Sequence, residues 1–182
     1  MMEQYAVIKA MEKLTSHPEK KFSVRGLAAE AGISPGASKA ALDYMRERRI
    51  VNLEIVGKTY QYRADLESPL CRQWKVLFNL EQLRVWQLVK EITEKLGNVH
   101  AILLYGSMGQ GTNDQKSDAD LLVIAHKPKK VRFDFARSMG REANITVMSM
   151  AEWKLNAAKN KVFYENVVYD SIVLHGKRPV IL

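Results

Sequence analysis

The stretch VHAILLYGSMGQGTNDQKSDADLLVIA, residues 99–125, decides the fold of the C-terminal half of the chain. It contains two apolar runs, residues 99–105 and 121–125, and a polar segment between them. The polar segment begins with Gly106-Ser107 and ends with Asp118-Ala119-Asp120. Short apolar runs bounded by turn residues are typical of buried strands. We therefore expect a strand, a Gly-Ser bend, a short excursion, a pair of acids and a second strand.

The two acids at the start of the second expected strand point to metal chemistry. Asp118 and Asp120 are separated by one residue, and side chains along a strand alternate between its faces, so both carboxylates should point to the same side. Two such carboxylates repel one another unless a cation lies between them, and Mg²⁺ prefers oxygen ligands of this kind together with substrate phosphates. We predict that Asp118 and Asp120 bind Mg²⁺ or Mn²⁺ and are the catalytic residues.

The residues around the acids supply the expected nucleotide contacts, which are Gly106, Ser107 and Ser117. Gly106 lets the backbone approach a ligand closely. Ser107 can cap a helix whose free N–H groups donate to phosphate oxygens. A phosphate site beside two metal-binding carboxylates is suited to nucleotidyl transfer, in which metals polarise the α-phosphorus and neutralise the leaving pyrophosphate. A dinucleotide fingerprint is disfavoured because Gly106, Gly109 and Gly111 follow the order G-x-x-G-x-G.

Gly106-Ser107 followed by Asp118-Ala119-Asp120 closely resembles the signature of the DNA polymerase β-like nucleotidyltransferase superfamily, in particular its minimal prokaryotic members. The resemblance covers about residues 80–182 and includes FYENVVYDSIVLHGK at 163–177, which is similar to the closing helix and strand of the family. It implies a small mixed sheet flanked by helices. It also implies that Ser107 contacts the terminal phosphates of a nucleoside triphosphate and that Asp118 and Asp120 bind Mg²⁺.

The third carboxylate of that family belongs on the next strand, which we expect at residues 143–148. On the relevant face of that strand the sequence has Asn144 and Thr146, and neither is an acid. Glu142 is one pleat away and is the candidate third acid if a bulge shifts the strand. Two functions therefore stay open: transfer of a nucleotide to a hydroxyl acceptor, and a transcription regulator whose nucleotidyltransferase-like domain is weak or inactive and acts in nucleotide sensing or assembly.

The N-terminal part contains FSVRGLAAEAGISPGASKAALDYMRERRIV at residues 22–51, in which Ser23 and Ser34 are expected helix caps. Two β-prone runs follow, joined at Gly57-Lys58. Helix, turn, helix and hairpin in this order resemble the winged helix-turn-helix of transcription regulators, over about residues 1–65. The resemblance implies DNA contacts on the second helix, on its basic end and at the hairpin tip, by Ser34, Ser38, Lys39, Arg46, Arg48, Arg49 and Lys58.

Composition restricts the class of protein and its partners. The 28 Lys and Arg against 20 Asp and Glu give a net charge of +8, which fits a polyanionic partner. Residues 1–65 have only 11 Lys and Arg against 8 Asp and Glu, so a protein-binding role for this part also stays open. A single cysteine excludes an internal disulfide framework and a four-cysteine zinc site. With no apolar stretch long enough to cross a bilayer, we expect a cytoplasmic protein without a membrane partner.

The predicted fold class is α+β, with a winged helix at residues 1–65, a linking helix at 66–79 and a nucleotidyltransferase-like domain at 80–182. Asn79 is expected to be a break or a cap between the two helices of this region. The linking helix has an apolar stripe that must be buried, either against the domains or as a homodimer seam. The stripe consists of Leu66, Leu70, Trp74, Leu77 and Phe78.

Overall fold

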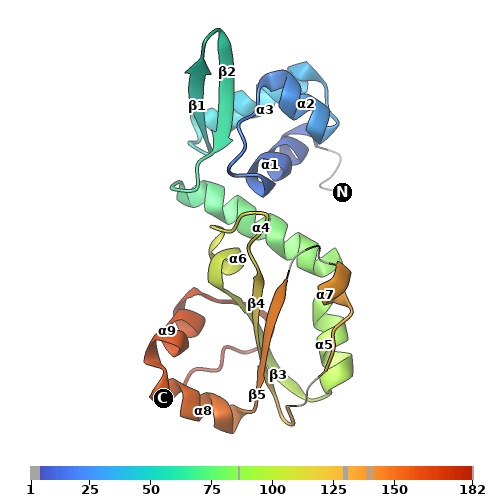
Figure 1. Cartoon of the computed structure of the whole chain (residues 1–182), viewed down its shortest axis with the longest axis vertical. Coiled ribbons are helices and arrows are strands. Elements are labelled where there is room, and N and C mark those ends of the chain that lie inside the picture. Colours follow the sequence, from blue (N-terminus) through green and yellow to red (C-terminus); the bar gives the residue numbers. More distant parts are fainter. Residues whose placement is uncertain (1–4, 86, 129–130, 139, 141, 182) are drawn as a thin grey trace. The chain divides into compact units, whose positions relative to one another are not determined.

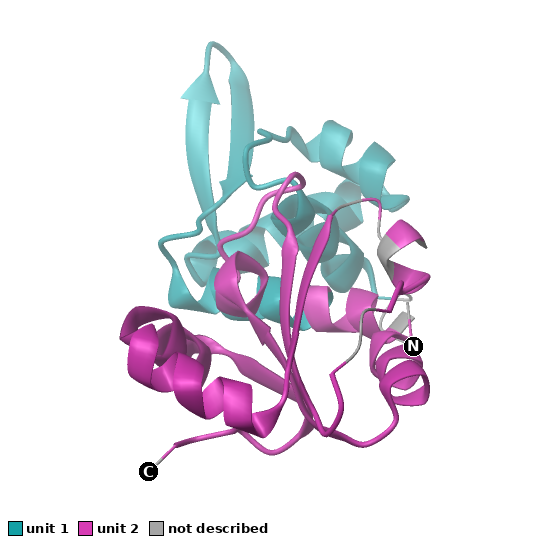
Figure 2. Cartoon of the chain, turned by 60° about the horizontal axis from the view of Figure 1, so that its bottom comes forward, with its two compact units in different colours: residues 1–78 teal, residues 79–182 magenta. Residues whose placement is uncertain are grey.

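The structure is a computed structural model of the 182-residue chain, and it describes residues 5–85, 87–128, 131–138, 140 and 142–181. The chain divides into two compact units, residues 1–78 and residues 79–182, which are coloured separately in Figure 2. One helix, α4 (Pro69–Val85), includes residues of both units. Among the described residues, no helix is both long enough and apolar enough to cross a membrane.

The first unit consists of three helices followed by an antiparallel hairpin, in the order that the sequence predicts (Figure 1). The elements are α1 (Ala6–Ser16), α2 (Val24–Ala31), α3 (Pro35–Glu47), β1 (Val51–Val56) and β2 (Thr59–Ala64). The predicted caps are confirmed, since Ser23 Oγ accepts a hydrogen bond from the Gly26 N–H and Ser34 Oγ accepts one from the Ala37 N–H. Gly32 ends α2 in the left-handed conformation at φ 62°.

The apolar stripe of residues 66–79 is largely used within the core of the first unit. Phe78 is buried there, and Leu66 and Trp74 pack against the same core, while Leu70 and Leu77 are exposed. The expected break at Asn79 is wrong, because α4 continues to Val85 and the next helix, α5 (Leu88–Leu96), begins after Gln87 in a left-handed conformation. A homodimer through residues 66–79 stays a prediction.

The second unit is built on a four-stranded mixed sheet in the order β5-β4-β3-β6. Its strands are β3 (Val99–Tyr105), β4 (Ala119–Ala125), β5 (Ala143–Met148) and β6 (Ile172–Gly176). Strand β3 is antiparallel to both β4 and β6, and β4 is parallel to β5. The predicted mixed α+β architecture of this half is therefore confirmed.

Both faces of the sheet are covered by helices (Figure 1). On one face, alternate residues such as Leu121 and Val123 pack against Leu88 and Ile92 of α5. On the other face, Leu122 and Ile124 pack against Trp153. The helices of this second face are α8 (Met150–Lys159) and α9 (Lys161–Asp170), and the shorter helices of the unit are α6 (Gly106–Gln110) and α7 (Phe135–Ser138). By strand alternation, Asp120 lies on the face that α8 and α9 cover.

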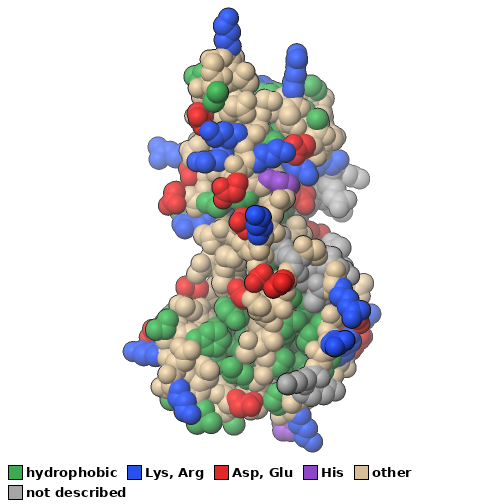
Figure 3. Space-filling view, viewed as in Figure 1, with side chains coloured by type: hydrophobic (Ala, Val, Ile, Leu, Met, Phe, Trp, Pro, Cys, Tyr) green, Lys and Arg blue, Asp and Glu red, His purple; other side chains and the backbone are tan. Residues whose placement is uncertain are grey.

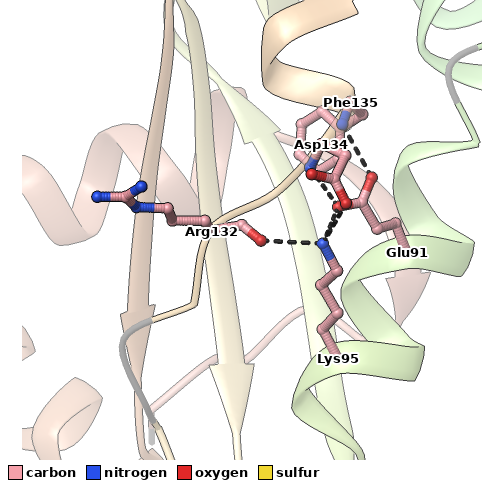
Figure 4. Close-up of polar contacts among 5 residues, drawn as sticks. All are labelled: Glu91, Lys95, Arg132, Asp134 and Phe135. Atoms are coloured by element: carbon pink, nitrogen blue, oxygen red, sulfur yellow. Dashed lines mark hydrogen bonds and ion pairs between the residues drawn. The ribbon is translucent and has the colours of Figure 1, made fainter.

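An ionic network joins α5 to the start of α7 (Figure 4). The two carboxylate oxygens of Glu91 accept hydrogen bonds from the backbone N–H groups of Asp134, at 2.5 Å, and Phe135, at 2.9 Å. Lys95 Nζ donates to Glu91 Oε1 at 2.8 Å, to Asp134 Oδ2 at 2.7 Å and to the Arg132 carbonyl oxygen at 3.0 Å. The network thus fixes the segment that leads into α7.

This network makes stability depend on pH in the acid range. Burial alone would raise the pKa of Glu91, but hydrogen bonds from Lys95, Asp134 and Phe135 outweigh burial and lower the pKa below its ordinary value of 4.5. The Lys95 hydrogen bond likewise lowers the pKa of Asp134 below 3.8. A carboxyl whose pKa is lowered by folding stabilises the fold above its unfolded pKa and loses that contribution as the pH falls through the folded value.

We therefore expect Glu91→Gln to flatten the dependence of stability on pH between about pH 5 and about pH 3. The measurement is the urea midpoint of the second unit across this range, in the wild type and in the variant. Glu94→Gln, at an exposed position of the same helix, is the control and should keep the wild-type slope. Identical slopes for wild type and Glu91→Gln would contradict the prediction.

Candidate functional site

The two predicted metal-binding acids come together at one end of the sheet. Asp120 pairs with Tyr105 at the end of β3 and with Asn144 near the start of β5. The side-chain amide nitrogen of Asn144 donates to Asp118 Oδ2 at 3.2 Å and to Asp120 Oδ1 at 3.1 Å. A single amide group therefore bridges both carboxylates. The acids lie on one side of the sheet, as strand alternation predicts.

The glycine of the Gly-Ser bend leaves room for one of these acids. Gly106 has a left-handed backbone at φ 67°, and a Cβ at this position would lie only 2.4 Å from Asp120 Oδ2. Any other residue at this position would therefore push the Asp120 carboxylate away. The need for glycine here comes from the carboxylate as well as from the backbone.

The neighbouring serines have different surroundings from those expected. Ser107 does not cap α6, because the helix begins one residue earlier at Gly106 and its N-cap position is Tyr105. Ser117 Oγ donates to Asp114 Oδ1 at 2.8 Å and accepts from the Asp114 N–H at 2.9 Å. The hydrogen bond from Ser117 is the largest influence that lowers the pKa of Asp114. Ser117 thus holds the loop before the acids, and nucleotide contacts by both serines stay predictions.

The structure does not bring Glu142 into the site as a third acid. Strands β4 and β5 pair without a bulge, so Asn144 lies beside Asp120, and Glu142 is exposed ahead of the strand. The Glu142 carbonyl oxygen accepts the Ala119 N–H at 2.9 Å. Within the part of the chain that the structure describes, no three side chains of His, Cys, Asp or Glu gather to hold a metal ion.

Tyr105 belongs to this site and was missed by the sequence reasoning. It ends β3 next to Gly106, and its hydroxyl shares a hydrogen bond with Thr146. The centroids of the Tyr105 and Phe163 rings lie 5.6 Å apart in a T-shaped arrangement. Burial, and then the negative charge of Asp120, raise the pKa of Tyr105. The phenol is therefore neutral at neutral pH. Its place directly before the Gly-Ser bend was the signal available in the sequence.

Comparison with known proteins places this site in a family. The family model for polymerase beta nucleotidyltransferases matches residues 87–179, just over half of the chain. The chain belongs to the polymerase beta nucleotidyltransferase family. The match covers Gly106, Ser107, both acids and Asn144. The matched region thus contains the Gly-Ser bend, both carboxylates and the amide that bridges them.

Two further comparisons add little. No curated protein matches the chain. Among solved structures, the chain is similar to the crystal structure of Sso10a-2, a DNA-binding protein from Sulfolobus solfataricus, with 17% identity and a TM-score of 0.36. That similarity covers 49% of this chain and 94% of the other. A likeness at so low a TM-score supports no conclusion about fold or function.

The predicted DNA-contact residues of α3 differ in how accessible they are. Ser38 is fully buried and its hydroxyl donates to the Val24 carbonyl oxygen at 2.9 Å, so the prediction that it faces DNA is wrong. Ser34 is exposed but caps α3. Lys39 is exposed and pairs with Asp43 at 2.5 Å, one turn further along the helix.

The basic end of α3 and the hairpin tip provide the other predicted contacts. Arg48 stacks over the Tyr44 ring at 3.8 Å and pairs with Glu47 at 3.5 Å, and Arg49 has a left-handed backbone at φ 53°. Figure 3 shows Lys and Arg side chains interspersed with Asp and Glu over the first unit. Among the described residues of that unit, the cations that form no ion pair include Arg25, Arg46, Arg49, Lys58 and Arg63.

The close approach of Gly106 to Asp120 can be tested by its effect on the free energy of unfolding. We expect Gly106→Ala to lower the free energy of unfolding by about 2–4 kcal/mol, because left-handed backbone strain and the clash with the Asp120 carboxylate add together. Gly140→Ala is the matched control, since Gly140 has a similar φ of 64° and a Cβ there meets nothing within 4 Å. It should cost only about 1 kcal/mol.

A double-mutant cycle isolates the clash. In an Asp120→Ala background, Gly106→Ala should cost no more than Gly140→Ala, because the carboxylate that it meets is gone. The measurement is urea unfolding of all four chains followed by circular dichroism. An unchanged cost of Gly106→Ala in that background would show that the two residues are not coupled.

Proposed function

We propose that the protein binds a nucleoside triphosphate together with Mg²⁺ or Mn²⁺ at Asp118 and Asp120. The observation that carries this proposal is the meeting of both carboxylates beside the Gly106 bend, within a sheet of the polymerase beta nucleotidyltransferase family. Both acids belong to the matched region. The remaining steps follow from the donor groups that surround them.

The residues present fit a divalent cation. Asp118 and Asp120 offer carboxylate oxygens, and the carboxamide of Asn144, which already lies within hydrogen-bond distance of both, has an oxygen that a half-turn would present to a cation. These three side chains would hold the ion. When bound, it would polarise the α-phosphorus of the nucleotide and neutralise the leaving pyrophosphate.

The surrounding side chains serve the nucleotide in other ways. Gly106 keeps the approach to Asp120 free of side-chain bulk. The neutral phenol of Tyr105 adds a hydroxyl without adding negative charge beside Asp120. Ser107, in the first turn of α6, is the residue that we assign to the terminal phosphates. This set can bind a triphosphate and place its α-phosphorus next to the acids.

The first candidate function is transfer of the nucleotide to a hydroxyl acceptor. The presence of Asn144 favours a second candidate function. A carboxylate at the third position would act as a metal ligand or as a base for the incoming hydroxyl. The amide of Asn144 can hydrogen-bond but cannot accept that proton at neutral pH. The second candidate is therefore a regulator that senses a nucleotide without transferring it efficiently.

Nucleotide binding should depend on both acids. We expect Asp118→Asn and Asp120→Asn each to weaken binding of a non-hydrolysable ATP, CTP, GTP or UTP analogue in the presence of Mg²⁺ by at least roughly tenfold, about 1.4 kcal/mol. Isothermal titration calorimetry measures this. Glu142→Gln removes a nearby exposed charge of the same sign and should bind as the wild type does.

A pyrophosphate-release assay with the four nucleoside triphosphates then separates the two functions. Release above that of the Asp118→Asn, Asp120→Asn double variant assigns transfer, and binding without release assigns sensing. Equal affinity of all variants for the nucleotide would refute the proposed site itself.

We infer that the first unit is a winged helix-turn-helix that binds DNA. Its three helices and hairpin support the assignment, and Arg46 and Lys58, near the end of α3 and at the hairpin turn, are exposed cations suited to phosphates. The interspersed acids of this unit favour a narrow phosphate contact rather than a broad basic surface. Arg48 and Arg49 belong to the same basic end of α3.

DNA binding should depend on these cations and on salt. We expect Arg46→Gln with Lys58→Gln to reduce affinity for duplex DNA and to lower the slope of log K against log salt by about 2, since each lost phosphate contact removes about 0.9. Arg49 is not substituted, because its backbone is left-handed and a change there would alter the stability of the fold together with DNA binding. Fluorescence anisotropy at several salt concentrations provides the measurement.

The matched control removes the same number of positive charges from the second unit. Lys154→Gln with Lys159→Gln alters two exposed lysines of α8 in the second unit. This pair should leave the salt slope unchanged. An equal loss of affinity in both double variants would show that binding depends on net charge alone. No binding by the wild type at low salt would refute DNA binding.

A further inference from the structure

Asn144 occupies the position between the two acids that a cation would take. Its amide nitrogen lies 3.2 Å from Asp118 Oδ2 and 3.1 Å from Asp120 Oδ1, so its two N–H groups serve one carboxylate each. This interaction holds two like charges side by side without a metal. It replaces, by hydrogen bonds, the attraction that a cation supplies in such a pair.

The strand register places Asn144 in this role. Asn144 is the partner of Asp120 in the parallel ladder between β4 and β5, and no bulge interrupts the six pairs from Ala119 to Ile124. The nearest acid along the strand, Glu142, does not join the two aspartates within the described part of the chain. The group between the carboxylates is therefore neutral.

The number of carboxylates then limits how many cations this site holds. Two carboxylates carry two negative charges, which one divalent cation balances in full. A bound triphosphate adds negative charge of its own, so a second divalent cation about 3.5–4 Å away, as in two-metal sites, is limited by the number of protein carboxylates that reach it. At the third position the neutral amide of Asn144 offers an oxygen ligand but no negative charge.

We propose that Asn144 makes this a one-cation site: its amide bridges Asp118 and Asp120 when no ion is bound, and turns to present its oxygen when one ion binds. This inference rests on the proposed function, and it specifies how many cations the same site binds. A single cation suffices to hold a triphosphate. The second cation, which would activate an acceptor hydroxyl, has no place. The chain therefore receives a nucleotide and does not pass it on efficiently.

Counting bound Mn²⁺ by electron paramagnetic resonance tests this directly. The full chain is titrated with Mn²⁺ in the presence of a non-hydrolysable nucleoside triphosphate, and the loss of the free-ion signal, less the loss with the nucleotide alone, gives the number bound to the chain. We expect one Mn²⁺ per wild-type chain. Asn144→Asp should bind two, and should bind the first about tenfold more tightly because a third carboxylate adds charge. Glu142→Gln should count as the wild type does.

A second measurement on the wild type keeps the inference testable if Asn144→Asp fails to fold. Asn144→Ser serves to assign the side-chain amide resonances of Asn144 in a ¹⁵N–¹H spectrum, because the signals missing from its spectrum belong to that group. Addition of Mg²⁺ with the nucleotide should shift these resonances in the wild type. The shift should be absent in Asp118→Asn.

The outcomes separate the two proposals. One Mn²⁺ in both the wild type and Asn144→Asp, or unmoved amide resonances while Asp118→Asn still loses the cation, overturns the role of Asn144 and leaves the proposed site intact. Two Mn²⁺ in the wild type also overturns it. No binding by any chain, or binding that Asp118→Asn and Asp120→Asn leave unchanged, overturns the proposed function itself.

Discussion

The pairing of β4 with β5 is the constraint on which the whole candidate site depends. It sets Asn144 next to Asp120 and so determines that an amide, rather than an acid, meets both carboxylates. The strand itself is anchored from both sides, since Leu121 and Val123 are buried on one face and Leu122 and Ile124 on the other. A shift by one residue would exchange the faces of a strand and would remove Asn144 from the acids.

Periodicity made the framework of this site predictable. The strands at 99–105 and 121–125 followed from short, mostly apolar runs, and the shared side of Asp118 and Asp120 followed from strand alternation. Ser23 and Ser34 followed from local capping chemistry. These features depend on a residue and its near neighbours, which is the information that a single sequence contains.

The features that the sequence did not reveal depend on distant neighbours. Asn79 looked like a helix break, but α4 continues beyond it to Val85. Its side-chain amide donates to the Met108 carbonyl oxygen and to Asn113 in the core of the second unit. Ser38 looked exposed, but it is packed against α2. The start of α6 depends on the left-handed Gly106 before Ser107, and Tyr105 became part of the site only through its contacts with Thr146 and Phe163.

If the first unit binds DNA as proposed, the ion pair between Lys39 and Asp43 on α3 bears on which sequences it accepts. If this lysine moved to a nucleic-acid phosphate, it would leave an aspartate facing a polyanion, and the resulting repulsion would offset much of the gain. An arbitrary stretch of DNA offers nothing to satisfy that acid. A base with an exposed amino group can donate a hydrogen bond to the Asp43 carboxylate. In the proposed complex with DNA, Asp43 would therefore favour sequences that offer such a donor, which a uniformly basic helix would not do.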